Sequence, residues 1–166
     1  LEVAKNFVDI GARPKKQETW IMESGWIKYP SDGSDPLHVD HPDEKIVVFD
    51  VETLYKVSNY AVIATAVSST AWYGWVSPVL TGESESFDHL IPMDTLAKER
   101  IIIGHNVGYD RARIAEEYNL KETKAFFLDT MALHIAASGM CSRQRPRWMQ
   151  HRKQKSDIEY TPDEIQ

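Results

Sequence analysis

A short apolar run that ends in acids constrains the fold of this chain more than any other feature. The run is Lys45-Ile46-Val47-Val48-Phe49-Asp50-Val51-Glu52, and its apolar residues are mostly β-branched. A continuous run of this length predicts a strand buried on both faces of a sheet. Asp50 and Glu52 are two residues apart, so a strand directs both carboxylates to one side. We therefore expect two acids at the end of a central strand.

Further runs of strand composition predict the rest of the sheet. Residues 61–67 and 71–76 are separated by Ser68-Ser69-Thr70, which predicts a hairpin. Three strands joined this closely favour an antiparallel meander. Residues 101–103 and 125–128 add two strands, each reached through a longer segment. The pattern predicts an α/β fold, with a mixed five-stranded sheet of an antiparallel meander followed by parallel strands, and helices on its faces.

Three helices are expected between and after the later strands. Residues 93–100 are the first candidate. The second begins at Asp110 and carries apolar residues at helical spacing. The third follows Asp129 and ends at Gly139. We assign Asp129 to helix capping, and a supporting hydrogen bond behind the metal ligands is the alternative.

The composition describes an acidic globular chain of about one domain. It has 166 residues with 19 Lys+Arg against 25 Asp+Glu, a net charge of −6. Its single cysteine, Cys141, excludes an internal disulfide and favours a reducing compartment. The apolar runs are far below the ~18 residues needed to span a bilayer, which excludes a membrane-spanning protein. The chain begins with Leu rather than Met, so we expect an excised piece of a longer protein.

One basic segment departs from this acidic character. Residues 143–155 contain Arg143, Arg145 and Arg147 among six Lys/Arg and no acid. Such a segment suits a polyanion, and a solvated flexible linker is the alternative. We divide the chain into an extended N-terminal segment (1–45), a main domain (46–140) and a basic linker with an acidic end (141–166).

A third acid accompanies Asp50 and Glu52. Asp110 follows a predicted strand and lies in the first turn of the next helix. If that strand neighbours the first, the three carboxylates meet at one edge of the sheet. Their repulsion in a poorly hydrated place favours a divalent metal, and Mg²⁺ takes such oxygen ligands. Solvent-facing acids at a strand end and plain helix capping by Asp110 are the alternatives.

These motifs resemble those of the DEDD 3′–5′ exonucleases, which have the ribonuclease H-like fold. The first motif is residues 47–54, and the second is Gly104-His105-Asn106-Val107-Gly108-Tyr109-Asp110. Within that superfamily the chain resembles the exonuclease (proofreading) domain of the mitochondrial DNA polymerase gamma family, which belongs to family A. Residues 127–131 and the upstream Trp20, Trp26 and Tyr29 carry the same resemblance. The resemblance covers nearly the whole chain.

The resemblance implies hydrolysis of the 3′-terminal phosphodiester by two Mg²⁺ ions, with Mn²⁺ as the alternative ion. Asp50 would bridge both ions, and Glu52 would hold the ion that activates the attacking water. Asp110 would bind the second ion, largely through water. His105 would be structural or would bind the strand's backbone, because Mg²⁺ prefers oxygen ligands.

The resemblance also implies contacts to DNA. Thr53 would hydrogen-bond the terminal nucleotide, Leu54 would pack on its base, and Asn106 would position the strand. The implied partners are a single-stranded 3′ end of DNA, the rest of the polymerase chain and an accessory subunit, in the mitochondrion. The alternatives are a free-standing DEDD exonuclease and a metal-free ribonuclease H-like module that binds nucleic acid.

One motif of this exonuclease type departs from the expected pattern. The type needs a fourth acid, with a Tyr four residues before it. The late candidate, Tyr160-Thr161-Pro162-Asp163-Glu164, has Glu at that position, and Pro162 interrupts the helix that both should share. We expect a domain truncated at its C-terminus, with an incomplete metal site and weak or no nuclease activity of the chain alone.

Overall fold

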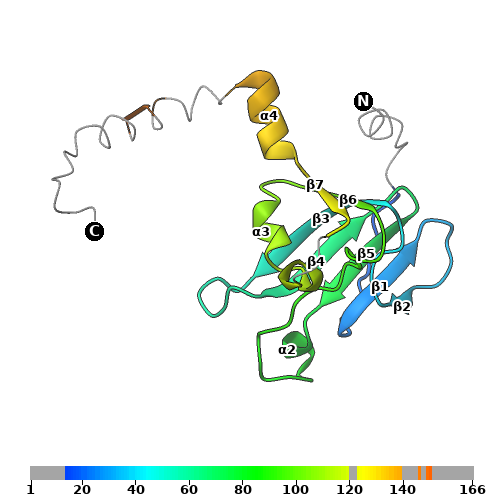
Figure 1. The fold of residues 1–166 in the computed structure, drawn as a ribbon. Coiled ribbons are helices and arrows are strands. Elements are labelled where there is room, and N and C mark those ends of the chain that lie inside the picture. The colour runs from blue at the N-terminus through cyan, green and yellow to red at the C-terminus, as the bar shows by residue number, and fades with distance from the viewer. Residues whose placement is uncertain (1–13, 120–122, 140–145, 147–148, 151–166) are drawn as a thin grey trace. The chain divides into compact units, whose positions relative to one another are not determined.

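A seven-stranded sheet forms the body of the computed structural model in Figure 1, which describes residues 14–119, 123–139, 146 and 149–150. The chain divides into two compact units, Leu1–Thr130 and Met131–Gln166. The strands are β1 (Gly25–Pro30), β2 (Leu37–Val39), β3 (Ile46–Thr53), β4 (Ala61–Val67), β5 (Ala71–Val76), β6 (Arg100–Gly104) and β7 (Ala125–Asp129). The helical segments are α2 (Pro78–Thr81), α3 (Gly108–Arg111), the 3₁₀ helix η1 (Ala115–Tyr118) and α4 (Thr130–Ser138).

The strand order is β2-β1-β5-β4-β3-β6-β7. Strands β3, β4 and β5 form the expected antiparallel meander. Strand β6 then pairs parallel with β3, and β7 pairs parallel with β6. The expected mixed α/β sheet is thus confirmed, and it has two strands more than predicted because β1 and β2 extend its other edge.

Aromatic residues of the N-terminal segment anchor these added strands. All of β1 pairs antiparallel with β5. Trp26 is buried, and its indole Nε1 donates to the carbonyl of Pro92 at 2.8 Å. Trp20 packs edge-on against Tyr29, with 4.9 Å between the ring centroids. These contacts join the N-terminal segment to the sheet, whereas the domain boundaries at 45/46 and 140/141 stay a prediction.

The core lies on one face of the sheet. In β3 the residues Val47, Phe49 and Val51 are buried, whereas Val48 between them is 44% exposed. The buried face packs against Ile91, Met93, Ile114 and other residues of one apolar cluster. The prediction of a strand buried on both faces was therefore wrong. Alternation within the run gives β3 one core face and one face that carries its two acids.

Two of the three helix predictions need correction. Residues 95–98 form turns and a bend rather than a helix, because Asp94 has φ +54° and the Thr95 carbonyl accepts the N–H of Lys124 at 2.7 Å instead of a helical donor. The helix expected from Asp110 breaks into α3 and η1. Ile91 pairs with the chain between them, where its N–H donates to the Arg113 carbonyl at 2.8 Å.

The third helix prediction is confirmed. Helix α4 spans Thr130–Ser138 and is followed by Gly139 at φ +73°, the left-handed conformation that commonly ends a helix. Across the described residues, none of the helices has the length and apolarity needed to cross a bilayer.

Candidate active site

Strand β3 presents Asp50 and Glu52 on its exposed side. Both side chains are exposed, and the alternating Phe49 and Val51 are buried. The pairing with β4 shifts register between Glu52 and Thr53. Such an irregularity bends a strand locally and redirects the side chains that follow it. Asp50 and Glu52 both precede this shift, so they lie on the same side of β3, as their spacing predicts.

Asp110 reaches the same end of β3 from a different element. The parallel pairing of β3 with β6 ends at the pair Val48–Ile103, so Val51 lies beyond it. The N–H of Val51 donates instead to Asp110 Oδ1 at 3.2 Å. Asp110 is only 3% exposed, and Val51 lies between Asp50 and Glu52 in sequence. The fold thus places Asp110 beside the end of β3 that carries Asp50 and Glu52. Neither helix capping by Asp110 nor the spacing of the acids along the chain requires this placement.

The environment of Asp110 opposes its ionisation. Burial, followed by the negative charge of Asp50, raises the pKa of Asp110 to about 6. The hydrogen bond from Val51 and the charge of Arg113 act in the opposite direction. Two carboxylates that repel in this way are stabilised by a cation between them.

A tight turn connects β6 to α3 and fixes the approach of Asp110. Gly104 ends β6, where an added Cβ would lie 2.9 Å from Val107 Cγ2 and 3.3 Å from the Phe49 carbonyl oxygen. Asn106 has φ +61°, a left-handed conformation that asparagine tolerates. Its N–H donates to Asp129 Oδ1 at 2.9 Å. Asp129 thus holds the turn that presents Asn106.

His105 takes part in the same turn. Its Nδ1 lies 3.2 Å from the hydroxyl of Thr130, which in turn donates to the Gly104 carbonyl at 3.0 Å. These contacts support the structural assignment of His105.

Tyr109 is a site residue that the sequence reasoning did not single out. Its hydroxyl lies 2.8 Å from Thr53 Oγ1, across the site from β3 to α3. The guanidinium carbon of Arg113 lies 3.7 Å from the centroid of the Tyr109 ring. The sequence signal that could have identified Tyr109 as a site residue is its position directly before Asp110. Leu54, next to Thr53, is 44% exposed and open to contact.

The donor set suits a hard divalent cation, because the carboxylate oxygens of Asp50, Glu52 and Asp110 are the ligands Mg²⁺ prefers. Burial first, and the negative charge of Asp50 second, raise the pKa of Asp110, and a bound cation would offset both effects. The side chains do not form a finished cage: in the described part of the chain, no three His, Cys, Asp or Glu residues are grouped closely enough to hold one ion.

Some predicted residues lie outside the described residues. These are Arg143, Arg145 and Arg147 of the basic segment and the candidate motif at 160–164. Their assignments stay predictions.

Comparison with known families identifies the family to which this fold belongs. Residues 1–166 match the family model of the DNA mitochondrial polymerase exonuclease domain. The chain belongs to this family. The match confirms both the expected polymerase gamma resemblance and the ribonuclease H-like fold that it implied.

Individual relatives agree with this assignment. DNA polymerase gamma of Saccharomyces cerevisiae is 56% identical over 149 residues, 90% of this chain and 12% of that protein. The mitochondrial DNA polymerase gamma of Neurospora crassa is 52% identical over 150 residues, 90% of this chain and 10% of that protein. The mitochondrial DNA polymerase subunit gamma-1 of Drosophila melanogaster is 39% identical over 150 residues, 80% of this chain and 13% of that protein.

The chain thus spans a small part of these relatives and corresponds to the exonuclease domain of the polymerase gamma family. The expected mitochondrial setting is confirmed by the names of the family and of two relatives.

Proposed function

We propose that this chain supplies the 3′–5′ proofreading exonuclease of a mitochondrial DNA-directed DNA polymerase. The observation that carries the proposal is the hydrogen bond from Val51 N–H to Asp110, since Val51 lies between Asp50 and Glu52 in β3. Membership in the exonuclease-domain family supports it. The reaction would release single nucleotides from a mismatched 3′ end during DNA replication.

The three acids would hold two divalent ions, Mg²⁺ or Mn²⁺. Bound ions would supply a nucleophilic water and stabilise negative charge on the phosphate and the leaving 3′ oxygen. Asp50 would bridge both ions, Glu52 would serve the ion on the water's side, and Asp110 would serve the second. Asp110 must be ionised for this role, which its environment opposes until a cation is present.

The substrate would be the single-stranded 3′ end of DNA. Thr53 and Leu54 would contact the terminal nucleotide from the end of β3, and Asn106 would position the strand from the turn before α3. The three arginines of the basic segment would contact phosphates. The rest of the polymerase and an accessory subunit would be the protein partners, and residues 46–140 would form the exonuclease domain proper.

The test uses the intact polymerase that carries this chain and a 5′-labelled single strand with Mg²⁺. Shortening by one nucleotide at a time from the 3′ end is the expected result, and Asp50→Ala should abolish it. Glu99→Ala is the matched control, because Glu99 is an exposed acid paired with Lys45. Products that shorten from the 5′ end, or Asp50→Ala activity equal to wild type, would contradict the proposal.

A second candidate is a metal-free ribonuclease H-like module that binds nucleic acid. The open arrangement of the three acids favours it, since among the described residues they form no ready group for one ion. Calorimetric titration of the intact polymerase with Mn²⁺ separates the two. A heat of binding that Asp50→Ala removes supports the exonuclease, whereas equal heats in both proteins support the module.

A further inference from the structure

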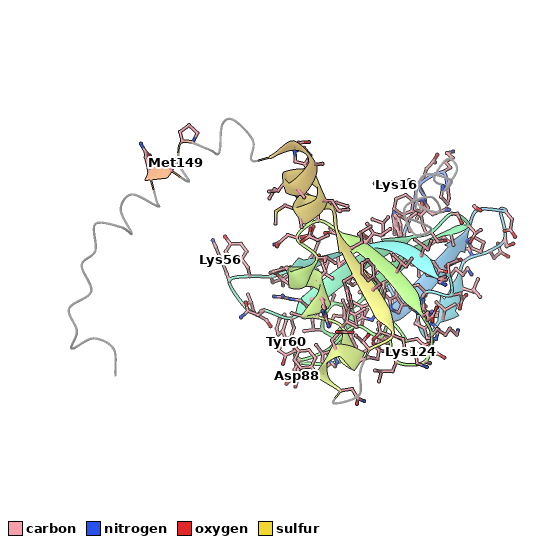
Figure 2. All side chains as sticks on the ribbon, turned by 45° about the horizontal axis from the view of Figure 1, so that its top comes forward. Lys16, Lys56, Tyr60, Asp88, Lys124 and Met149 are labelled. Atoms are coloured by element: carbon pink, nitrogen blue, oxygen red, sulfur yellow. The ribbon has the colours of Figure 1, made fainter. Side chains whose placement is uncertain are left out.

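A groove runs beside the candidate active site, between the loop that follows β3 and the segment that follows α3. Figure 2 labels Lys56 near the outer end of this loop and Tyr60 where the chain returns to β4. The groove has a volume of about 440 Å³. It is lined by Asn59, Tyr60, Ala112, Arg113 and Tyr118.

Arg113 is held in place at this groove by neutral groups. Its Nε donates to the Asn59 carbonyl at 3.0 Å and its Nη1 to the Tyr109 carbonyl at 2.6 Å. The guanidinium also stacks on the Tyr109 ring. Among the hydrogen bonds and ion pairs of the described residues, Nη2 donates to no acceptor and no carboxylate lies within 4.0 Å of Arg113. The side chain is therefore a fixed cation with donors left for an anion.

Two tyrosines add aromatic surface to the groove. Tyr118 is 65% exposed, yet its hydroxyl donates to the Ala112 carbonyl at 2.7 Å. This bond anchors the ring at one end and leaves its surface open. Tyr60 is 38% exposed. Aromatic faces beside a cation are the features that bind single-stranded nucleic acid without regard to sequence.

The acids next to the groove are occupied by other partners. Glu116 accepts the backbone N–H groups of Met93 and Asp94. Glu117 forms an ion pair with Arg111 at 2.7 Å. Their charges are thus partly compensated, which lowers the repulsion that a phosphate would meet in the groove.

The groove is continuous with the site through Tyr109, whose hydroxyl meets Thr53 and whose ring carries Arg113. We infer that this groove binds the nucleotides on the 5′ side of the terminal one, with Arg113 on a backbone phosphate and Tyr60 and Tyr118 stacked on bases. The inference rests on the proposed function, since it extends the path of the same strand.

The test measures kcat/KM of the intact polymerase for two substrates, a single strand of ten nucleotides and the p-nitrophenyl ester of thymidine 5′-monophosphate, which has no nucleotide on its 5′ side. Arg113→Gln and Tyr118→Ala should each lower kcat/KM for the ten-nucleotide strand about 5- to 50-fold. Tyr118→Ala should change kcat/KM for the ester little, because the ester has no nucleotide to place in the groove. Arg113→Lys should recover part of the loss, and Tyr118→Phe should keep the wild-type rate because it retains the ring.

Lys45→Gln is the matched control for loss of an exposed cation, and it should leave kcat/KM for both substrates unchanged. For Arg113→Gln, the slope of log(kcat/KM) against log[salt] should become shallower by about one. Equal losses of kcat/KM for the ten-nucleotide strand and the ester in Tyr118→Ala would overturn the inference, because Tyr118 would then act on the metal site. Wild-type rates in both variants, as expected if another part of the protein covers the groove, would also overturn it. Absence of cleavage by the wild type would instead contradict the proposed function.

Discussion

The backbone N–H of Val51 donates to the carboxylate of Asp110 at 3.2 Å, although 59 positions separate the two residues in the chain. Val51 lies beyond the last β3–β6 pair, so the carboxylate takes the place of a strand partner. The same bond brings a nearly buried acid to the exposed acids of β3. A structural hydrogen bond therefore holds Asp110 beside the end of β3 that carries Asp50 and Glu52.

Asp110→Asn should make the metal-free chain more stable at pH 8. The pKa of Asp110 is raised in the folded state to about 6, from an ordinary 3.8. The stabilisation from the neutral acid is complete below the unfolded pKa and is lost as pH rises through the folded pKa. Asparagine stays neutral and can still accept from Val51, so its advantage should appear between pH 4 and 6 and persist above.

Thermal unfolding of the two proteins across this pH range, in the presence of a chelator, checks the prediction. A change of ~1 kcal/mol in the free energy of unfolding moves Tm by about 2–4 °C. Glu99→Gln is the control, because its carboxylate is exposed. Identical pH profiles for Asp110→Asn and wild type would contradict the prediction.

Gly104→Ala should destabilise the chain and misplace Asp110. The added methyl would overlap Val107 and press on the Phe49 carbonyl, and overpacking of this kind costs about 1–3 kcal/mol. Gly108→Ala is the matched control, since an added Cβ there meets nothing within 4 Å. Denaturant unfolding of both variants tests this, and equal midpoints would show that the turn adapts.

Arg100→Met should destabilise the fold more than any surface substitution. Arg100 is 2% exposed, and its guanidinium donates to the carbonyls of Pro42 and Glu44. Removing it leaves those carbonyls without that donor, and a loss of about 3 kcal/mol is expected. Lys45→Met, at an exposed neighbouring position, should change stability by less than about 0.5 kcal/mol. Chemical denaturation of both variants measures the free energy of unfolding. Similar losses for the two substitutions would contradict the stabilising role of Arg100.

Tyr109→Phe should lower exonuclease activity without unfolding the chain. The change removes only the hydroxyl that meets Thr53, while the ring that stacks with Arg113 remains. Loss of one such hydrogen bond predicts a decrease in kcat/KM of about 3- to 10-fold. Tyr55→Phe, on the exposed loop after β3, is the control. Equal kcat/KM for the wild type, Tyr109→Phe and Tyr55→Phe would contradict the prediction, because the hydroxyl of Tyr109 would then not help to position Thr53.

Local patterns were sufficient for the central strands. The β-branched runs before Asp50 and at 101–103, and the short Ser-Ser-Thr turn, predict β3, β4, β5 and β6 because strand and turn preferences act over a few neighbours. They also place Asp50 and Glu52 on one side of a strand. The later helix α4 was predictable for the same reason, since its start at Thr130 and its end at Gly139 are local signals.

Contacts between distant segments decided what the patterns missed. The predicted helix at 93–100 is absent because Asp94 has φ +54° and the Thr95 carbonyl accepts the N–H of Lys124, nearly thirty residues along the chain. Strand β1 pairs with β5, which lies more than forty residues along the chain, and β2 joins the sheet by pairing with β1. Such pairings override weak local preferences.

The sequence by itself determined the acids of β3, their common side and the membership of the chain in its family. Only the tertiary structure decided that Asp110 would bond to Val51, that Tyr109 would meet Thr53 and that Arg113 would remain without a carboxylate partner among the described residues. The physical reason is range: side-chain direction follows from a residue's own backbone, whereas burial, charge and hydrogen bonding depend on which remote segments the fold brings alongside it.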